Sequence, residues 1–186
     1  MDKNNSYQRK VLFLSNTANF SKFNLPYMRW FKELGWRVDY ASAGEEEVKD
    51  CDNQYTISIA RSPFSLKNFK AYRQLKKILS ENHYDILHCH TPMGAVVARL
   101  AGKSFRKNGL KIIYTAHGFH FYKGAPILNW IMFYPVEKWL SKYTDVLVCI
   151  NEEDYELAMR KKFKAKKIVK IDGVGVNLEK YNPLSL

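Results

Sequence analysis

The sequence lacks the features that define several protein classes. Its 186 residues contain only three cysteines, Cys51, Cys89 and Cys149, and no two of them have C-x-x-C spacing. Three unevenly spaced cysteines provide no disulfide framework and are typical of a reducing compartment. No uninterrupted apolar run reaches about 18 residues, so no membrane-spanning helix is expected.

The first residues carry no export signal. The chain begins with the polar stretch MDKNNSYQRK, and the apolar run VLFLS at 11–15 is too short for the core of a signal peptide. We therefore expect a cytoplasmic protein, and peripheral contact with the inner face of the plasma membrane stays open.

Positive charge is what the sequence has in excess. Lysine and arginine total 30 against 18 aspartates and glutamates, which gives a net charge of +12. This balance favours anionic partners such as nucleic acid, anionic lipid or phosphorylated ligands. No helix-turn-helix, zinc-finger or RNP pattern accompanies the charge, so we expect no nucleic-acid partner.

A doubly wound α/β fold follows from the order of the periodic segments. Most of the strand-like runs are continuously apolar, as in strands of a parallel sheet that is buried on both faces. These runs span 11–15, 37–42, 54–59, 85–90, 111–116, 145–150 and 167–171. Helical patterns alternate with them at 24–34, 66–81, 93–107, 127–143 and 152–164. Such alternation predicts a mostly parallel, seven-stranded sheet with helices on both faces.

Two details of the helices are also predicted. In 66–81, the spacing places Leu66 and Phe69 on the inward face. Asn151 with Asp154 three residues later has the spacing of an N-cap with an acidic third position. The acidic connection 43–53 has no helical period and is expected to be a surface loop.

The loop after the first strand contains no G-x-G-x-x-G, because no glycine occurs between Ser15 and Leu34. A nucleotide-binding loop of the dehydrogenase type is therefore disfavoured, and no cofactor is predicted. Asn16 and Thr17 either cap the following helix or form a polar wall of a cleft.

The stretch HCHTPMG, 88–94, ends the fourth strand-like run. Strand alternation places His88 and His90 on one face. The His-x-His spacing permits a zinc site, but no third ligand is close in sequence, and no metal is predicted. We expect His88 to be structural and His90 to face a cleft, with Thr91 capping the next helix.

The stretch YTAHGFHFYKGAP, 114–126, crowds histidines, glycines and aromatics into one connection. His117 follows the strand directly, and Gly118 permits close approach of a ligand to the backbone. Phe119 and His120 come next, and Lys123 marks a turn. At least one of the phenylalanines is expected only to fill space over the sheet.

The segment 127–133 contains more apolar residues than one helix face can bury. Some of them must be exposed or contact something apolar. Together with the basic stretches 67–77 and 160–167, they fit an anionic membrane surface, although lysine runs are most often simply solvated.

Four stretches, taken together and in order, resemble a known family. They are DILHCHTPMGAVVARLAG, IIYTAHGFHFYKGAP, YPVEKWLSKYTDVLVCINEEDYELA and IDGVGVNLEK. They resemble the amino-terminal half of family-four (group 1) retaining glycosyltransferases, in the CapM- or EpsD-like branch that makes capsular polysaccharides and exopolysaccharides.

The resemblance implies the amino-terminal half of a GT-B fold, in which two Rossmann-like domains face each other across a cleft. Residues 1–172 would be the acceptor-side domain and 173–186 the interdomain linker. The carboxy-terminal domain, which in the family binds most of the nucleotide-sugar donor, would be absent. The 186-residue chain would then be half of a retaining hexosyltransferase and inactive alone.

The resemblance also implies roles for the strand-end residues. His117 would act in catalysis by facing the donor sugar and phosphate, with Gly118 beside it. We expect the acceptor to be a glycan, typically linked to polyprenyl diphosphate. The residues predicted to line its side are Asn16, Thr17, His90, Thr91, Phe119, His120 and Lys123. Two alternatives stay open: a nucleotide-sugar 2-epimerase type of GT-B enzyme, and a non-catalytic, membrane-associated subunit of a split transferase.

Overall fold

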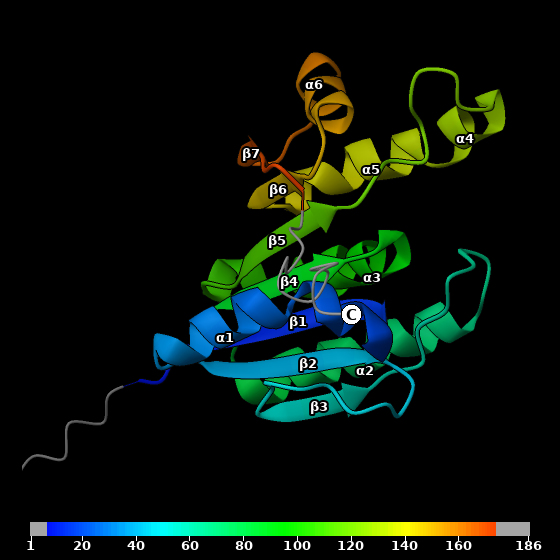
Figure 1. Cartoon of the computed structure of the whole chain (residues 1–186). Coiled ribbons are helices and arrows are strands. Elements are labelled where there is room, and N and C mark those ends of the chain that lie inside the picture. Colours follow the sequence, from blue (N-terminus) through cyan, green and yellow to red (C-terminus); the bar gives the residue numbers. More distant parts are fainter. Residues whose placement is uncertain (1–6, 174–186) are drawn as a thin grey trace, which may run out of the picture.

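The computed structural model describes residues 7–173, and its centre is one seven-stranded sheet (Figure 1). The order is β3-β2-β1-β4-β5-β6-β7, and every neighbouring pair is parallel. The strands are β1 Lys10–Thr17, β2 Arg37–Ala43, β3 Asn53–Thr56, β4 Ile86–His90, β5 Lys111–Ala116, β6 Val146–Cys149 and β7 Lys167–Lys170. The predicted doubly wound fold is confirmed, with all seven strands near their expected positions.

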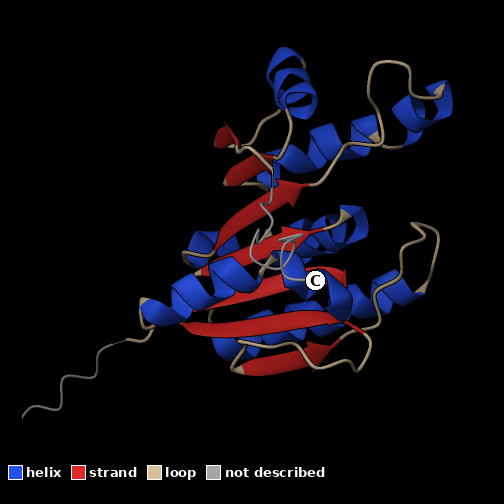
Figure 2. Ribbon diagram, in the orientation of Figure 1, coloured by secondary structure: helices blue, strands red, loops and turns tan. Residues whose placement is uncertain are grey.

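Helices cover both faces of the sheet (Figure 2). They are η1 Ala18–Phe23, α1 Leu25–Glu33, α2 Lys67–Asn82, α3 Pro92–Gly102, η2 Phe105–Asn108, α4 Ile127–Met132, α5 Tyr134–Leu140, η3 Ser141–Tyr143 and α6 Glu152–Arg160. Helix α1 lies in front of the sheet in this view, whereas α2, α3 and α5 lie behind it. Separate apolar clusters fill the two sides.

The continuous apolar runs are explained by this two-sided cover. In β1, Val11 and Phe13 belong to the cluster under α1, whereas Leu12 and Leu14 belong to the cluster under α2 and α3. All four side chains are fully buried. Alternate side chains of β1 therefore pack into opposite layers, and none of the four is exposed to solvent.

The first strand and the fourth are neighbours at the centre of the sheet. After β1 the chain turns toward β2 at one edge, and after β4 it turns toward β5 and the other edge. The two carboxyl ends therefore diverge at a topological switch point, where a doubly wound sheet forms a crevice. Thr17 and Thr91 lie at the mouth of this crevice.

Several boundaries differ from the sequence prediction. The single helix expected over 127–143 is divided into α4, α5 and η3, and the helix expected over 93–107 ends at Gly102. Strand β3 ends at Thr56, although Ile57 and Ile59 remain buried. The connection 43–53 is irregular, as predicted, apart from its two end residues, the last residue of β2 and the first residue of β3.

The predicted inward face of α2 is wrong at its first turn. Leu66 and Phe69 are 89% and 61% exposed, and the buried stripe runs instead through Asn68, Ala71 and Leu75. The reason is that the buried amide of Asn68 bonds the preceding loop, which rotates the apolar residues beside it outward. The Asn151 cap is confirmed, since its Oδ1 accepts a hydrogen bond from the Asp154 backbone N at 2.8 Å.

Among the described residues, no helix combines the length and the apolar character needed to cross a bilayer. Residues 174–186, which make up most of the predicted linker 173–186, lie outside the described part of the chain.

Candidate functional site

Asn16 and Thr91 join the ends of β1 and β4. The Thr91 hydroxyl donates to Asn16 Oδ1 at 2.8 Å and accepts from the Asn16 backbone N at 3.2 Å. Thr91 occupies the N-cap position of α3, but its side chain makes no capping bond, contrary to the expectation. Its φ is +63°, a left-handed value that is costly for a β-branched residue. Backbone strain of this kind clusters at active sites and ligand-binding positions.

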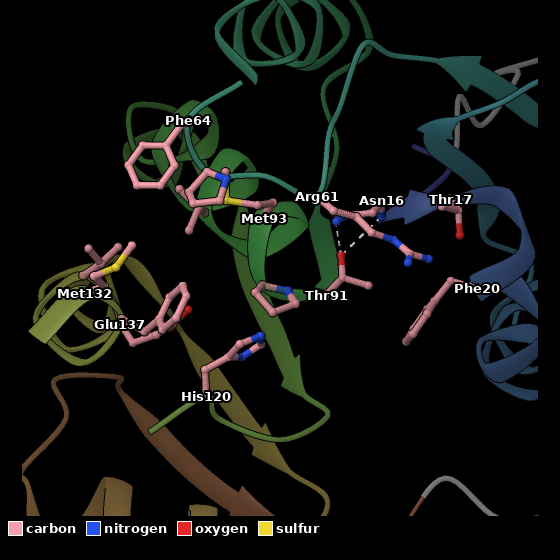
Figure 3. A pocket seen from close by; sticks show the side chains of 15 residues that line it. Asn16, Thr17, Phe20, Arg61, Phe64, Thr91, Met93, His120, Met132 and Glu137 are labelled. Atoms are coloured by element: carbon pink, nitrogen blue, oxygen red, sulfur yellow. Dashed lines mark hydrogen bonds between the residues drawn. The ribbon is translucent and has the colours of Figure 1, made fainter. Parts of the chain in front are cut away.

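A cavity of about 800 Å³ opens beside this pair (Figure 3). Its volume lies within the range of about 300–1,000 Å³ that is usual for ligand sites. It extends from the switch point to α5. The cavity is lined by Asn16, Thr17, Phe20, Arg61, Pro63, Phe64, Thr91, Pro92, Met93, Val96, His120, Met132, Phe133, Val136 and Glu137.

The lining of this cavity is divided by polarity. Figure 3 shows Asn16, Thr17, Arg61 and Thr91 on one side, whereas apolar side chains such as Met93 lie on the other. Most of the remaining wall is aromatic or aliphatic. Such a wall suits an amphiphilic ligand better than a purely polar one.

Glu137 contributes no free charge to the cavity. Its two carboxylate oxygens accept hydrogen bonds from Arg99 Nη1 and Nη2 at 2.8 and 3.0 Å. Arg99 is buried, and its guanidinium lies 4.5 Å from the ring centre of Tyr114. The pair therefore closes the floor of the cavity as a neutral, bidentate unit.

Three histidines gather on the opposite side of Phe20. His88 Nε2 lies 2.9 Å from Thr115 Oγ1, and His90 Nδ1 lies 3.1 Å from His117 Nε2. The edge of Phe20 packs on His117, with ring centres 4.8 Å apart. These histidines line a second, smaller cavity of about 140 Å³.

Burial determines the charge of this cluster. It lowers the pKa of His88 to about 3 and holds the pKa of His90 well below its usual value, with nearby imidazoles acting in the same direction. Burial also lowers the pKa of the half-buried His117. All three rings are therefore neutral near pH 7. A neutral imidazole at His117 can offer a ligand a hydrogen bond but not a full charge.

The backbone after His117 is held by α6. Gly118 has a φ of +122°, a conformation that favours glycine. The backbone N of Phe119 donates to both carboxylate oxygens of Asp154, at 3.2 and 3.1 Å. Asp154 is itself fixed by Asn151, whose Nδ2 donates to it at 3.0 Å. The N-terminus of α6 thus sets the direction in which the His117–Gly118 turn points.

The phenylalanines of this loop fill space. Phe119 and Phe121 are both buried, and their rings stack with centres 4.9 Å apart. Phe119 packs further on Phe163. A direct acceptor contact by Phe119 does not fit this placement, because the side chain is committed to the core.

The predicted site residues fall into three groups. Asn16, Thr17, Thr91 and His120 line the large cavity. His90 and His117 line the small one, and His90 is only 2% exposed, so the expected cleft-facing position of His90 is wrong. Gly118, Phe119 and Lys123 line neither of these two cavities. The backbone N of Lys123 donates to Glu153 Oε1 at 3.0 Å.

Sequence reasoning missed Arg61, Phe64 and Glu137. The first two lie in the connection after β3, which carried no recognisable motif, and Glu137 lies beyond a helix break that the pattern did not show. The available signal was the apolar excess in 127–133, since Met132 and Phe133 line the cavity. Among residues 7–173, no group of three or more His, Cys, Asp or Glu side chains is arranged to hold a metal ion.

The fold is that of one half of a GT-B architecture, and a sequence comparison identifies the family. Residues 10–151 match the family described as glycosyl transferase 4-like. The chain belongs to this family.

Two curated relatives are similar to this chain in sequence. The chain is 50% identical over 178 residues to "Putative glycosyltransferase EpsD" of Bacillus subtilis (strain 168), which covers 95% of this chain and 47% of the relative. It is 28% identical over 156 residues to "UDP-Gal:alpha-D-GlcNAc-diphosphoundecaprenol alpha-1,3-galactosyltransferase" of Escherichia coli, covering 82% and 37%. The chain therefore spans less than half the length of these relatives.

A solved structure supports the fold. The crystal structure of a "putative UDP-N-acetylglucosamine 2-epimerase from Listeria monocytogenes" matches with a TM-score of 0.63 at 12% identity, over 87% of this chain and 44% of that one. At this identity the likeness concerns the fold alone. It agrees with one half of a GT-B architecture.

Proposed function

We propose that this chain is the acceptor-side half of a retaining hexosyltransferase, which moves a sugar from a nucleotide donor to a glycan acceptor in bacterial surface polysaccharide synthesis. The observation that carries the proposal is the large cavity at the switch point, beside a histidine at the next strand end. A polyprenyl-diphosphate-linked acceptor is supported by the E. coli relative, whose name specifies a sugar linked to diphosphoundecaprenol as the acceptor.

His117 is proposed to act on the donor. Its ring lies at the carboxyl end of β5, next to the open backbone of Gly118. A retaining transfer develops positive charge on the sugar while the nucleotide diphosphate leaves. A neutral imidazole that is fixed by His90 can donate or accept one oriented hydrogen bond there. Gly118 leaves room for the sugar, since nothing lies within 4 Å of a Cβ built on it.

The other half of the enzyme is proposed to bind most of the nucleotide sugar. Residues 1–172 would then form the acceptor domain, and 173–186 the connection to the donor domain. The 186-residue chain alone is expected not to turn over, because the donor site would be incomplete. Sugar transfer by the purified chain alone would contradict this division of roles.

We also propose that the domain works at the cytoplasmic face of an anionic membrane. Support comes from exposed apolar side chains on two projections near the cavity: Phe64 and Leu66 before α2, and Ile127 and Ile131 in α4. In a flotation assay with anionic vesicles at low salt, the chain should bind, and Ile131→Asp should weaken binding. Equal binding to anionic and neutral vesicles, together with equal binding by the Ile131→Asp variant, would contradict the proposal.

A chimera tests the transfer itself. Residues 1–172 are joined to the carboxy-terminal half of the B. subtilis relative, and product is measured with and without a lipid-linked acceptor. We expect a glycosylated acceptor, and a loss of kcat/KM in the His117→Ala variant. The epimerase alternative stays open because structures of 2-epimerases share the fold. It predicts that the donor sugar is changed even when no acceptor is present. The split-subunit alternative predicts activity only after a separate partner is added.

A further inference from the structure

The connection between β3 and α2 places a cation at the polar end of the large cavity. Arg61 lines this cavity together with Asn16, Thr17 and Thr91 (Figure 3). Within residues 7–173 it takes part in no salt bridge, whereas the cavity's carboxylate, Glu137, is neutralised by Arg99. The cavity therefore presents one unneutralised guanidinium.

The backbone on both sides of Arg61 is anchored by the fold and is not a loose loop. The buried side chain of Asn68 accepts a hydrogen bond from the Ala60 backbone N at 2.9 Å and donates to the Ser62 carbonyl at 2.7 Å. These two bonds hold the residues on either side of Arg61. Gln74 adds a third anchor, since its Oε1 accepts from the Ser58 backbone N at 2.8 Å. A buried amide at this place has no packing advantage over leucine, so its use is to hold the connection.

Beyond this cation the cavity is apolar. The wall is formed by Met93 and Val96 of α3 and, opposite them, by Met132 at the end of α4, Phe133 between the helices and Val136 of α5. The two rims continue into exposed apolar side chains, Phe64 at 80% and Ile131 at 65% exposure. A glycan would leave this wall without polar partners, whereas a branched hydrocarbon chain would cover it.

We infer that the cavity holds the lipid end of the acceptor: the first isoprene units of a polyprenyl diphosphate occupy the apolar wall, and Arg61 binds the diphosphate. This inference rests on the proposed function and assigns the substrate class of its cavity. A guanidinium matches phosphate oxygens in a bidentate geometry, which sets the register of the lipid. The glycan end then extends from Arg61 and Thr91 past Phe20 toward His117.

The binding test uses the 186-residue chain and farnesyl diphosphate as the probe, with farnesol and inorganic diphosphate as partial ligands, in isothermal titration calorimetry. We expect farnesyl diphosphate to bind more tightly than either partial ligand. Arg61→Ala should weaken it at least about tenfold, which is the usual effect of losing a charged hydrogen bond, and should leave farnesol binding unchanged. Val136→Asn should weaken both prenyl ligands.

Two matched controls keep the test specific. Arg73 is an exposed arginine on α2 outside the cavity, where its guanidinium lies 4.9 Å from the ring centre of Phe69. Met159 is an exposed apolar residue on α6. Arg73→Ala and Met159→Asn should both bind farnesyl diphosphate like the unchanged chain.

The inference is overturned if Arg61→Ala binds farnesyl diphosphate unchanged, or if inorganic diphosphate binds as tightly as the prenylated form. Failure of the lipid assignment can be distinguished from failure of the proposed transferase function by comparing farnesyl diphosphate binding with sugar transfer. Sugar transfer by the chimera without farnesyl diphosphate binding would remove the lipid assignment alone. Farnesyl diphosphate binding without any transfer would leave the lipid site standing and remove the transferase role.

Discussion

The Nδ1 atom of His90 lies 3.1 Å from the Nε2 atom of His117, with His90 almost fully buried. A hydrogen bond at this distance needs one donor and one acceptor, so at least one of the two facing nitrogens carries no proton. The tautomer of His117 is therefore linked to that of a ring in the core. His90 thus orients His117 and does not itself line the large cavity.

The same burial makes stability depend on pH. The pKa of His88 is lowered to about 3 and that of His90 lies well below its usual value, whereas both titrate near 6.5 in the unfolded chain. Below pH 6.5 the unfolded state therefore binds protons that the folded state does not, and stability falls with falling pH. Between pH 7 and 5 each of these histidines should cost about 2 kcal/mol of unfolding free energy.

Urea denaturation at pH 7 and pH 5 measures this loss. His90→Gln should remove about half of the pH dependence that His88 and His90 contribute. Equal unfolding free energies at the two pH values would show that the histidines are not buried as described.

The buried pair of Arg99 and Glu137 should be strongly coupled. Arg99→Met leaves the Glu137 carboxylate without its bidentate partner and should cost about 3–5 kcal/mol. The double variant Arg99→Met, Glu137→Met removes both charges and should recover much of that loss. A double-mutant cycle in urea measures the coupling, and strictly additive losses would contradict it.

Asp154 should act as a positioning residue for the His117–Gly118 turn. Asp154→Ala removes the acceptor of the Phe119 amide, so hydrogen exchange at that amide should accelerate about 10–100-fold. Asp154→Asn keeps one acceptor oxygen and should recover part of the protection. In the chimera, Asp154→Ala should lower kcat more than it raises KM.

A neighbouring carboxylate provides the control. Glu153 accepts from the Lys123 backbone N in the same loop, so Glu153→Ala should affect exchange at Lys123 only. Equal exchange at Phe119 in Asp154→Ala and the unchanged chain would remove Asp154 from this role.

Gly94 should be intolerant of a side chain because of Thr91. A Cβ on Gly94 would lie 2.7 Å from Thr91 Oγ1 and 3.3 Å from Leu14 Cδ2. Gly94→Ala should therefore cost about 1–3 kcal/mol and disturb the Asn16–Thr91 hydrogen bonds. In a Thr91→Ala background the closest clash is gone, and the cost should shrink. Thermal denaturation of the unchanged chain, the two single variants and the double variant checks this, and the same cost in both backgrounds would contradict it.

The sequence predicted those parts of the molecule that depend on local pattern. Continuous apolar runs identified the strands, and the Asn151 cap was confirmed. Leu66 was misplaced because the turn before α2 is set by the amide of Asn68, which carries no periodic signal. His90 was misplaced because its burial depends on Phe13, which is far away in sequence but stacks on its ring from the neighbouring strand β1.

The large cavity could not be predicted for a similar reason. Its walls come from five separate segments, and its charge depends on which carboxylate is neutralised by Arg99. Those facts follow from long-range packing. Resemblance to a family indicated the edge of the sheet where the site lies, but it did not indicate Arg61.

The central claim is that this half of the enzyme selects the acceptor. A domain exchange tests it: residues 1–172 and the matching segment of the E. coli galactosyltransferase relative are each joined to the same donor half, and each product is offered a panel of lipid-linked acceptors and nucleotide sugars. We expect acceptor preference to change with the amino-terminal half while donor preference stays constant. A donor preference that moves with residues 1–172, with acceptor preference unchanged, would contradict the account.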